Sequence, residues 1–256
     1  LGFHPDAAGF QSEGLVWRDG VPLQGIHPRR TAFALGDVPA GRLELLVEAA
    51  SNPAFPMRVG GRNMGSLRTA GDAPIYRLRQ AALGRRSSDV FHLLLDVEVL
   101  LGLMSSLPAS SPRRQRLLRE LTAAFDLVDL TSSSTIAATA ASARAALVPA
   151  LARRNGDSAH RVIGVGHAHI DSAWLWPMRE TVRKCARTFA SAVRMIDEYP
   201  EYRFVCSQAA QYEWMATQYP ALFDKIRDRV ATGGWQPVGG MWVEADMNLP
   251  SGESIV

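Results

Sequence analysis

The spacing of apolar residues changes twice along the chain, and these changes constrain its fold more than any other feature. Up to about residue 90, the apolar stretches are short, and glycine and proline interrupt them throughout. From there to about residue 155, apolar side chains recur at three- and four-residue intervals, as on one face of a helix. After that, strand-like and helix-like stretches alternate. The sequence therefore predicts three parts: 1–90, 91–155 and 156–256.

The first part, residues 1–90, has the pattern of an all-β region. Residues 14–17 and 21–24 are strand-like and flank Arg18-Asp19-Gly20, a turn sequence that favours a hairpin. Residues 42–45 alternate polar and apolar side chains, as a half-buried strand does. Several short strands with frequent turns predict a β-sandwich, jelly-roll-like in its connections.

The second part, residues 91–155, is predicted to be a helical linker. A first helix carries apolar side chains on one face from Leu93 to Met104. A second helix is expected at about 111–128, and a third, rich in alanine, at about 133–153. Asn155-Gly156-Asp157 then marks a break.

The third part, residues 156–256, alternates strands and helices. Strands are expected at 162–165, a buried run, at 202–206 and from 233 to 246; helices are expected at 179–199 and 211–230, with a break near Pro220. This order predicts an α/β portion with parallel strands, resembling an incomplete β/α barrel. In such folds, the chemistry gathers at the carboxyl ends of the strands.

Composition excludes several kinds of partner. The net charge is only +3, and no aromatic residues interleave with the densest basic cluster, residues 113–116, so no nucleic acid is expected to bind. The most apolar stretch, 91–107, is too short and too charged to span a membrane. Cys185 and Cys206 form no CxxC pair and suit a reducing compartment, which indicates a cytoplasmic protein. The chain starts at Leu1 rather than Met and stops at Ser-Ile-Val without a terminal signal, so we expect a fragment truncated at both ends.

Residues 166–176, GHAHIDSAWLW, place two histidines and an aspartate at alternate positions after the first strand of the third part. A strand points alternate side chains to one side, so His167, His169 and Asp171 face the same way if the extended conformation persists. Imidazole nitrogen and carboxylate oxygen suit Zn²⁺, and a catalytic zinc ion has about three protein ligands. The pattern favours a metal site over three ordinary polar residues at a strand end.

Two further features lie near this motif. Glu244 and Asp246 share one side of the third extended segment, where one of them could complete the metal site, act as a nucleophile, or do both. Taken alone, each is more simply a solvated loop acid. For Trp174 and Trp176, the spacing favours core packing; the alternative for Trp174 is an aromatic wall for a sugar ring.

Three segments together resemble the glycoside hydrolase family 38 α-mannosidases: GHAHIDSAWLW at 166–176, CSQAAQYEW at 206–214 and GGMWVEADMNLPSGES at 239–254. The last two are most similar to the cytosolic/vacuolar branch, as are the preceding β-region and helices. The resemblance implies that His169 and Asp171 are zinc ligands.

The same resemblance implies roles for three more residues. It implies that Asp246 is both a zinc ligand and the catalytic nucleophile. It also implies that Trp174 forms the floor of the mannose subsite and that His167 supports the site without binding the ion. The family's remaining ligand, a histidine, and its general acid, an aspartate, have no counterpart up to Val256. We therefore expect residues 1–256 alone to be inactive.

The implied function is a retaining, zinc-dependent α-mannosidase that hydrolyses terminal α-mannosides of an oligosaccharide or glycan through a glycosyl-enzyme on Asp246. Two alternatives stay open. HxH after a first barrel strand also resembles the amidohydrolases, although no histidine follows His169. The chain could also be a non-catalytic carbohydrate-binding fragment. A homo-oligomer is an open expectation.

Overall fold

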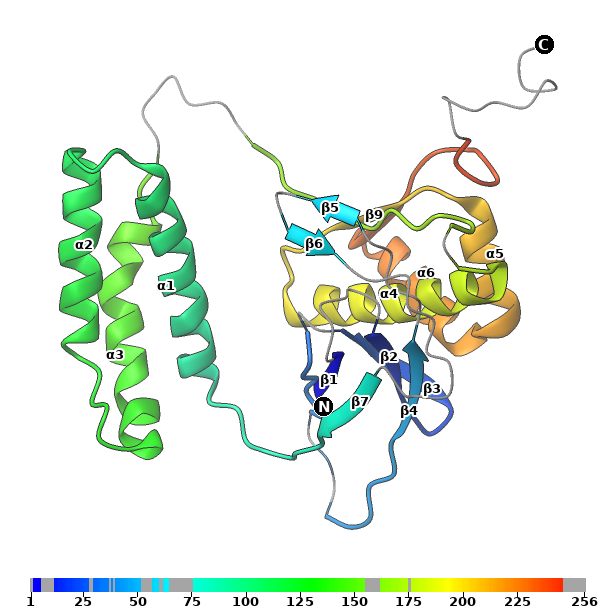
Figure 1. Cartoon of the computed structure of the whole chain (residues 1–256), viewed down its shortest axis with the longest axis horizontal. Coiled ribbons are helices and arrows are strands. Elements are labelled where there is room, and N and C mark those ends of the chain that lie inside the picture. The colour runs from blue at the N-terminus through cyan, green and yellow to red at the C-terminus, as the bar shows by residue number, and fades with distance from the viewer. Residues whose placement is uncertain are drawn as a thin grey trace. The chain divides into compact units, whose positions relative to one another are not determined.

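The computed structural model divides the chain into two compact units, one formed by residues 1–82 with 163–256 and the other by residues 83–162. Figure 1 shows both, with helices and strands labelled. The structure describes the following residues: 2–5, 12–27, 30–36, 38, 40–51, 57–59, 62–64, 76–154, 162–174 and 176–245.

A three-stranded antiparallel sheet with the order β3-β2-β4 belongs to the first unit. Strands β2 (Ser12–Arg18) and β3 (Val21–Ile26) form a hairpin. Its turn residues, Asp19 and Gly20, have φ angles of 52° and 76°. Two successive positive φ angles are typical of the tight hairpin turn that an Asp-Gly pair favours. The predicted hairpin is confirmed.

Strand β4 (Leu46–Ser51) pairs with the other edge of β2 and begins later than the sequence predicted. Its first residue lies opposite Trp17, the last residue of β2 in this ladder. Residues 42–45 run beyond the end of the ladder, so the predicted strand there is wrong. Two short antiparallel pairs also belong to this unit: β1 (Gly2–Pro5) with β7 (Tyr76–Gln80), and β5 (Met57–Val59) with β6 (Arg62–Met64).

The second unit is a bundle of three helices, α1 (Ser88–Ser106), α2 (Pro112–Phe125) and α3 (Ser133–Leu151). All three lie where the apolar spacing predicted helices. They share one apolar core, in which the small alanines of α3 allow close helix packing. The buried core residues are Leu93, Leu100, Leu117, Leu121, Ala124, Ala140, Ala143, Leu147 and Ala150.

Helix α3 is the one helix among the described residues that is long and apolar enough to cross a membrane, judged by length and composition alone. A single such helix is weak grounds for a membrane span, because the core helix of a bundle has the same properties. Four side chains of α3 are buried in the core of the second unit.

A capping box holds the start of α3. The Ser132 hydroxyl accepts a hydrogen bond from the Thr135 backbone N–H, and the Thr135 hydroxyl accepts one from the Ser132 backbone N–H, both at 3.1 Å. Because this cap satisfies donors that the helix itself leaves free, we expect Ser132→Ala to lower the free energy of unfolding by about 1 kcal/mol. Chemical denaturation measures the change. Ser133→Ala is the matched control, and equal losses in the two variants would contradict the capping role.

The rest of the first unit alternates strands and helices. Three short parallel strands form a sheet with the order β10-β9-β8. In chain order, the elements are β8 (Gly166–His167), α4 (Met178–Glu198), β9 (Phe204–Cys206), α5 (Ala209–Gln218), α6 (Pro220–Ala231) and β10 (Trp235–Pro237). Parallel β/α units are therefore present as predicted, and Pro220 begins a new helix where the break was expected. A closed barrel stays a prediction.

The first strand of this sheet differs from the prediction. Residues 162–165 lie outside the sheet, and Val162 and Ile163 are 89% and 72% exposed. Pairing with β9 involves only Gly166 and His167. Because β8 is an edge strand of the described sheet, no described neighbour covers the apolar run before it. The prediction of a buried strand at 162–165 is therefore wrong.

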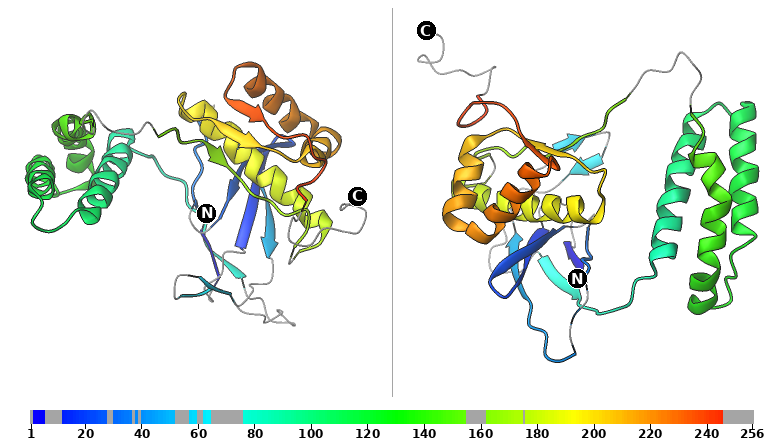
Figure 2. Two further views of the ribbon diagram at one scale, coloured as in Figure 1. Left: turned by 90° about the horizontal axis from the view of Figure 1, so that it is seen from above. Right: turned by 180° about the vertical axis from the view of Figure 1, so that it is seen from behind.

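Helix α4 packs between the antiparallel and the parallel sheet of the first unit (Figures 1 and 2). On the antiparallel side, Gly25 of β3 approaches so closely that a Cβ there would lie 2.6 Å from the carbonyl oxygen of Arg187. Glycine at position 25 therefore permits this contact. The Ser191 hydroxyl accepts a hydrogen bond of 3.0 Å from the Gly25 N–H.

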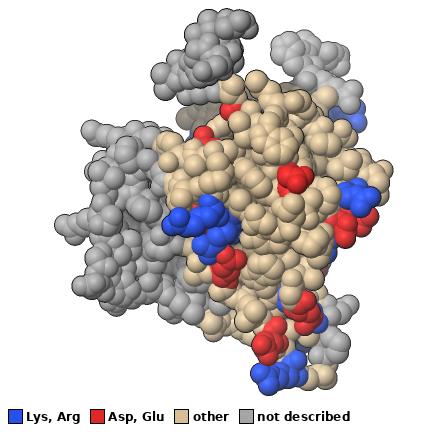
Figure 3. Space-filling model, turned by 90° about the vertical axis from the view of Figure 1, so that its right-hand side faces the viewer, with Lys and Arg blue, Asp and Glu red and all other residues tan. Residues whose placement is uncertain are grey.

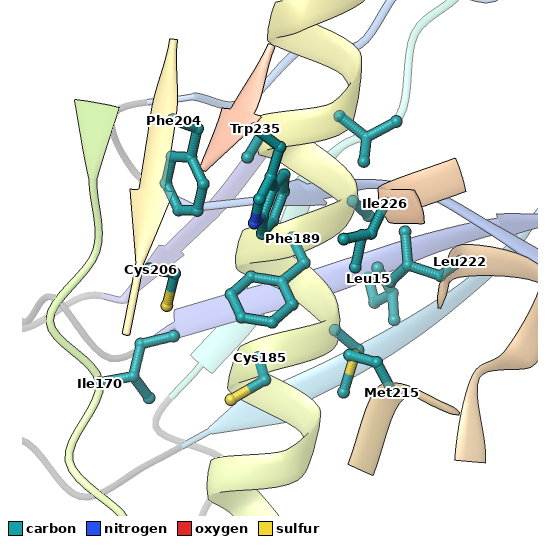
Figure 4. Packing of buried hydrophobic residues seen from close by; sticks show 14 of the residues in the cluster. Leu15, Ile170, Cys185, Phe189, Phe204, Cys206, Met215, Leu222, Ile226 and Trp235 are labelled. Atoms are coloured by element: carbon teal, nitrogen blue, oxygen red, sulfur yellow. The ribbon is translucent and has the colours of Figure 1, made fainter. Parts of the chain in front are cut away.

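On the other side of α4, aromatic rings form the centre of the core (Figure 4). Phe189 of α4 meets Trp235 of β10 edge to face at 5.1 Å and stacks on Tyr212 of α5 at 5.9 Å. The polar atoms are satisfied, since the Trp235 indole donates to the Tyr212 hydroxyl, which donates to the carbonyl of Cys206. This core joins β9, β10 and the segment after β8, through Ile170, to α4.

Charged side chains form no single positive area on the face drawn in Figure 3, where basic groups lie beside acidic ones. This distribution fits the small net charge of +3.

Candidate functional site

The predicted ligands His169 and Asp171 follow the end of strand β8. The strand stops at His167, so residues 168–171 are not part of the ladder, and the alignment of all three side chains by one extended segment stays a prediction. His169 and Asp171 nevertheless meet, with 3.2 Å between Nε2 and Oδ1. Their side chains are 64% and 39% exposed, whereas Ile170 between them is buried in the core.

His167 takes a different position from these two residues. Its Nδ1 lies 3.0 Å from the carbonyl oxygen of Val205 on β9. A carbonyl oxygen only accepts hydrogen bonds, so we assign the proton to Nδ1. The imidazole ties the end of β8 to the neighbouring strand.

A second carboxylate, Glu244, lies on the far side of the His169 ring. Its Oε2 is 3.2 Å from Nδ1 of His169, and its other oxygen accepts a hydrogen bond from the Ser207 hydroxyl. The imidazole of His169 therefore stands between two carboxylates, Asp171 at Nε2 and Glu244 at Nδ1.

Glu244 reaches this position because the chain turns after strand β10. Strand β10 ends at Pro237, although the next residue, Val238, still donates its N–H to the Cys206 carbonyl oxygen of β9 at 3.2 Å. Gly239 then adopts a φ of 80°, which residues with a Cβ disfavour. The prediction of one extended segment from 233 to 246 is therefore wrong, and the turn, rather than strand alternation, brings Glu244 to His169.

The start of helix α5 holds the returning segment. The backbone N–H groups of Ala209 and Ala210 donate to the carbonyl oxygens of Met241 and Trp242, at 3.2 and 2.9 Å. The first N–H groups of a helix have no partner within the helix, so they are free to bind another segment. These two hydrogen bonds fix the backbone just before Glu244.

The distances at His169 suit a zinc ion. Two ligand atoms bound to a tetrahedral zinc ion are about 3.3 Å apart, close to the 3.2 Å between His169 Nε2 and Asp171 Oδ1. With Nε2 toward an ion, the Nδ1–H can donate to Glu244, since metal-bound histidines commonly donate their other N–H to a carboxylate. The third predicted ligand, Asp246, lies outside the described residues. No three His, Cys, Asp or Glu side chains within the described residues are placed to hold an ion by themselves, so a site here needs at least one more ligand.

Helix α4 holds the backbone of Asp171. The Thr181 hydroxyl donates to the Asp171 carbonyl oxygen at 3.3 Å and accepts from the Trp176 indole N–H at 3.0 Å. The Lys184 ammonium lies 4.7 Å from the centroid of the Trp176 ring, within cation–π range. Trp176 is therefore a half-buried packing residue that connects the loop to α4.

Trp174 is the more exposed of the two tryptophans, with 50% of its surface accessible. Its ring meets Trp176 edge to face, with 5.5 Å between centroids. The prediction from spacing that Trp174 packs in the core is wrong. A half-exposed indole that contacts Trp176 fits the alternative, an aromatic wall for a sugar ring.

Gln208 and Gln211 belong to this site, although the sequence analysis gave them no role. Both are buried, and both side-chain amides donate to the carbonyl oxygen of Ile170, between His169 and Asp171. The sequence feature that could have indicated a role is the presence of two amide side chains, three residues apart, near the start of a predicted helix. Their common acceptor could not be identified from the sequence.

Comparison with known proteins gives two family matches. Residues 4–84 match the alpha-mannosidase jelly roll domain, and residues 159–256 match the N-terminal domain of the glycosyl hydrolases family 38. A jelly-roll region followed by an α/β portion was predicted, and the matches confirm that order.

Curated relatives agree with these matches. Alpha-mannosidase 2C1 of Homo sapiens is 39% identical and that of Mus musculus 38% identical, each over 95% of this chain and 23% of the relative. Alpha-mannosidase G of Dictyostelium discoideum is 30% identical over 95% of this chain and 22% of its own length. The chain thus spans less than a quarter of the length of these relatives. Residues 159–256 thus match family 38, and the chain is similar to relatives named alpha-mannosidase along 95% of its length.

Proposed function

We propose that this chain is part of a retaining, zinc-dependent α-mannosidase that hydrolyses terminal α-mannosides of an oligosaccharide or glycan. The observation that carries the proposal is the meeting of His169 and Asp171 at the carboxyl end of β8, with Glu244 against the other nitrogen of the imidazole. The match of residues 159–256 to family 38 and the relatives named alpha-mannosidase support it. The complete protein below is the longer polypeptide that contains this chain.

The residues proposed to hold the zinc ion are His169, Asp171 and Asp246. When bound, zinc supplies positive charge that orients sugar hydroxyl groups and favours distortion of the ring. Glu244 would accept the Nδ1–H of His169, which fixes the ring so that Nε2 faces the ion. Trp174 would stack its exposed indole face on the sugar.

The proposed chemistry uses two carboxyl groups, as in other retaining glycosidases. The Asp246 carboxylate attacks the anomeric carbon while a carboxylic acid elsewhere in the complete protein protonates the departing oxygen. The C–O bond to the leaving group breaks as the bond to Asp246 forms. Water, deprotonated by the same acid/base residue, then releases mannose with retained configuration. The two displacements account for the retention.

Replacing the proposed ligand His169 tests the metal site. We expect the complete protein to carry zinc, and His169→Ala to weaken zinc binding at least about tenfold, because the variant loses a nitrogen ligand. Elemental analysis after dialysis, with a chelator competition, measures this. His92→Ala is the control, since His92 lies on α1 and bonds only within that helix. Full zinc content in His169→Ala would sink the ligand assignment.

The alternative reactions have a direct assay. An amidohydrolase would cleave an amide or ester and leave nitrophenyl α-mannoside intact, whereas a carbohydrate-binding protein would bind mannose without cleaving either substrate. The family match disfavours both alternatives. Hydrolysis of the mannoside with retained configuration supports the proposal.

A cytoplasmic location belongs to the same proposal. Cys185 and Cys206 are free and buried, and burial raises the pKa of the Cys206 thiol to about 11. Neither cysteine forms a disulfide bond, so neither requires an oxidising compartment. A homo-oligomer stays a prediction, which the mass in solution tests.

A further inference from the structure

The carbonyl oxygen of Ile170 accepts hydrogen bonds from two buried side-chain amides. Nε2 of Gln208 lies 2.9 Å from it and Nε2 of Gln211 lies 3.0 Å from it. Gln208 is 4% exposed and Gln211 fully buried. A carbonyl oxygen has two lone pairs, so this acceptor is saturated by two donors that water does not reach. The peptide joining Ile170 to Asp171 is thereby fixed in orientation.

The opposite ends of both amides are also bound, which sets the orientation of each amide. The Ser172 hydroxyl donates to Oε1 of Gln208 at 2.8 Å, and the Cys206 thiol donates to Oε1 of Gln211 at 3.3 Å. The raised pKa of this buried thiol keeps its proton in place at neutral pH. With both oxygens occupied as acceptors, both Nε2 groups must face Ile170.

The clamped carbonyl of Ile170 belongs to the backbone between the two predicted ligands. It lies between His169 and Asp171, whose side chains point to a common place, while the Ile170 side chain points into the core (Figure 4). A rotation of the peptide after Ile170 would swing Asp171 away from His169 Nε2. The two amides oppose that rotation.

The same turn of α5 also holds the segment that carries Glu244, through the backbone N–H groups of Ala209 and Ala210. Residues 208–211 therefore bind one ligand-bearing segment with side chains and the other with the backbone. The two segments also meet directly, where Glu244 Oε2 lies 3.2 Å from His169 Nδ1.

We propose that Gln208 and Gln211 are positioning residues, which clamp the Ile170 carbonyl so that His169 and Asp171 present their ligand atoms to one metal ion. The inference rests on the proposed zinc-dependent function. It predicts that the clamp sets metal affinity, although neither glutamine touches the metal or the substrate.

The test replaces each glutamine by methionine, which keeps the length of the side chain but cannot donate a hydrogen bond. In the complete protein, Gln208→Met and Gln211→Met are each expected to weaken zinc binding by about 10- to 100-fold in a chelator competition. Visible absorption of the cobalt-substituted protein, which reports ligand geometry, is expected to change as well. Gln218→Met, at the exposed end of the same helix, is the control and should leave both readouts unchanged.

Thermal melting of the metal-free variants separates positioning from stability. A folded variant with unchanged zinc affinity and an unchanged cobalt spectrum overturns the clamp. If the methionine variants do not fold, Ser172→Ala decides: it removes only the hydroxyl that holds Gln208, and is expected to weaken zinc binding about two- to tenfold. Unchanged affinity in Ser172→Ala then overturns the proposal.

A measurement that does not depend on metal can test the clamp even if the proposed zinc-dependent function is wrong. If the unchanged complete protein binds no zinc, the zinc-dependent function fails, and amide hydrogen exchange of the metal-free protein tests the clamp alone. Faster exchange confined to residues 167–173 in the folded variants supports the clamp; unchanged exchange there overturns it.

Discussion

Asp246→Ala is expected to lower hydrolysis of nitrophenyl α-mannoside by the complete protein at least about a thousandfold, because loss of a catalytic nucleophile removes the covalent route. The residue is proposed as the nucleophile by its position in the segment GGMWVEADMNLPSGES. Steady-state kinetics measures the loss. Zinc content is measured in parallel, since Asp246 is also a proposed ligand.

Azide distinguishes a missing nucleophile from general damage. Added to Asp246→Ala, it should restore part of the turnover by attacking the anomeric carbon from the side that the aspartate occupied, so that the C–O bond to nitrophenolate breaks as a C–N bond forms. The product should be a mannosyl azide of inverted configuration. Asp224→Ala is the control, because this acid lies on α6 with 71% of its side chain exposed. More than a tenth of the original activity left in Asp246→Ala would contradict the assignment.

Glu13→Ala is expected to lower the free energy of unfolding by about 3–5 kcal/mol, the typical cost of removing one partner from a buried ion pair. Glu13 of β2 lies between two cations of α4: its oxygens are 2.9 Å from Lys184 Nζ and 2.6 Å from an Arg187 nitrogen. The side chains of these cations are only 10% and 5% exposed. The variant leaves two buried positive charges with less compensation.

The matched control is an ion pair of the same type on the surface. Glu44 pairs with Arg42 at 3.1 Å, but their side chains are 69% and 88% exposed, so Glu44→Ala should cost less than about 1 kcal/mol. Chemical denaturation at neutral pH compares the two variants. Equal losses of unfolding free energy in Glu13→Ala and Glu44→Ala would contradict the burial of the ion pair between β2 and α4.

The same pair predicts a dependence of stability on pH. Burial alone would raise the pKa of Glu13, but the nearby charges of Arg187 and Lys184 outweigh this and hold the pKa below its ordinary value of 4.5. A lowered pKa in the folded state means that the contribution is fully present above pH 4.5 and is lost as the pH falls through the folded-state value. The difference in stability between the unchanged protein and Glu13→Gln should therefore shrink as the pH is lowered below 4.5.

Local chemistry explains which elements could be predicted from the sequence. The helices α1 to α6 follow from apolar spacing over a few turns and from Pro220, which suits the first turn of a helix and separates α5 from α6. The hairpin follows from Asp19-Gly20, whose positive φ angles a tight turn requires. Each of these features depends on neighbours within a few residues.

The strand errors have a different origin. Residues 162–165 have the composition of a buried strand, yet they are exposed and lie outside the described sheet. The chain turns at Gly239, just after the Val238 N–H bonds to Cys206 of β9, so strand alternation does not carry as far as Glu244. Burial depends on what lies alongside, which a local pattern does not contain.

By itself, the sequence determined the alternation of elements, the resemblance to family 38 and the proposal of His169 and Asp171 as ligands, because motifs and periodicity are local properties of the chain. Only the tertiary structure decided that Glu244 faces the other nitrogen of His169, that Trp174 is exposed, and that Gln208 and Gln211 share one acceptor. Those contacts join residues about forty or more positions apart along the chain. They form only when packing of the strands and α4 places the loop ends side by side.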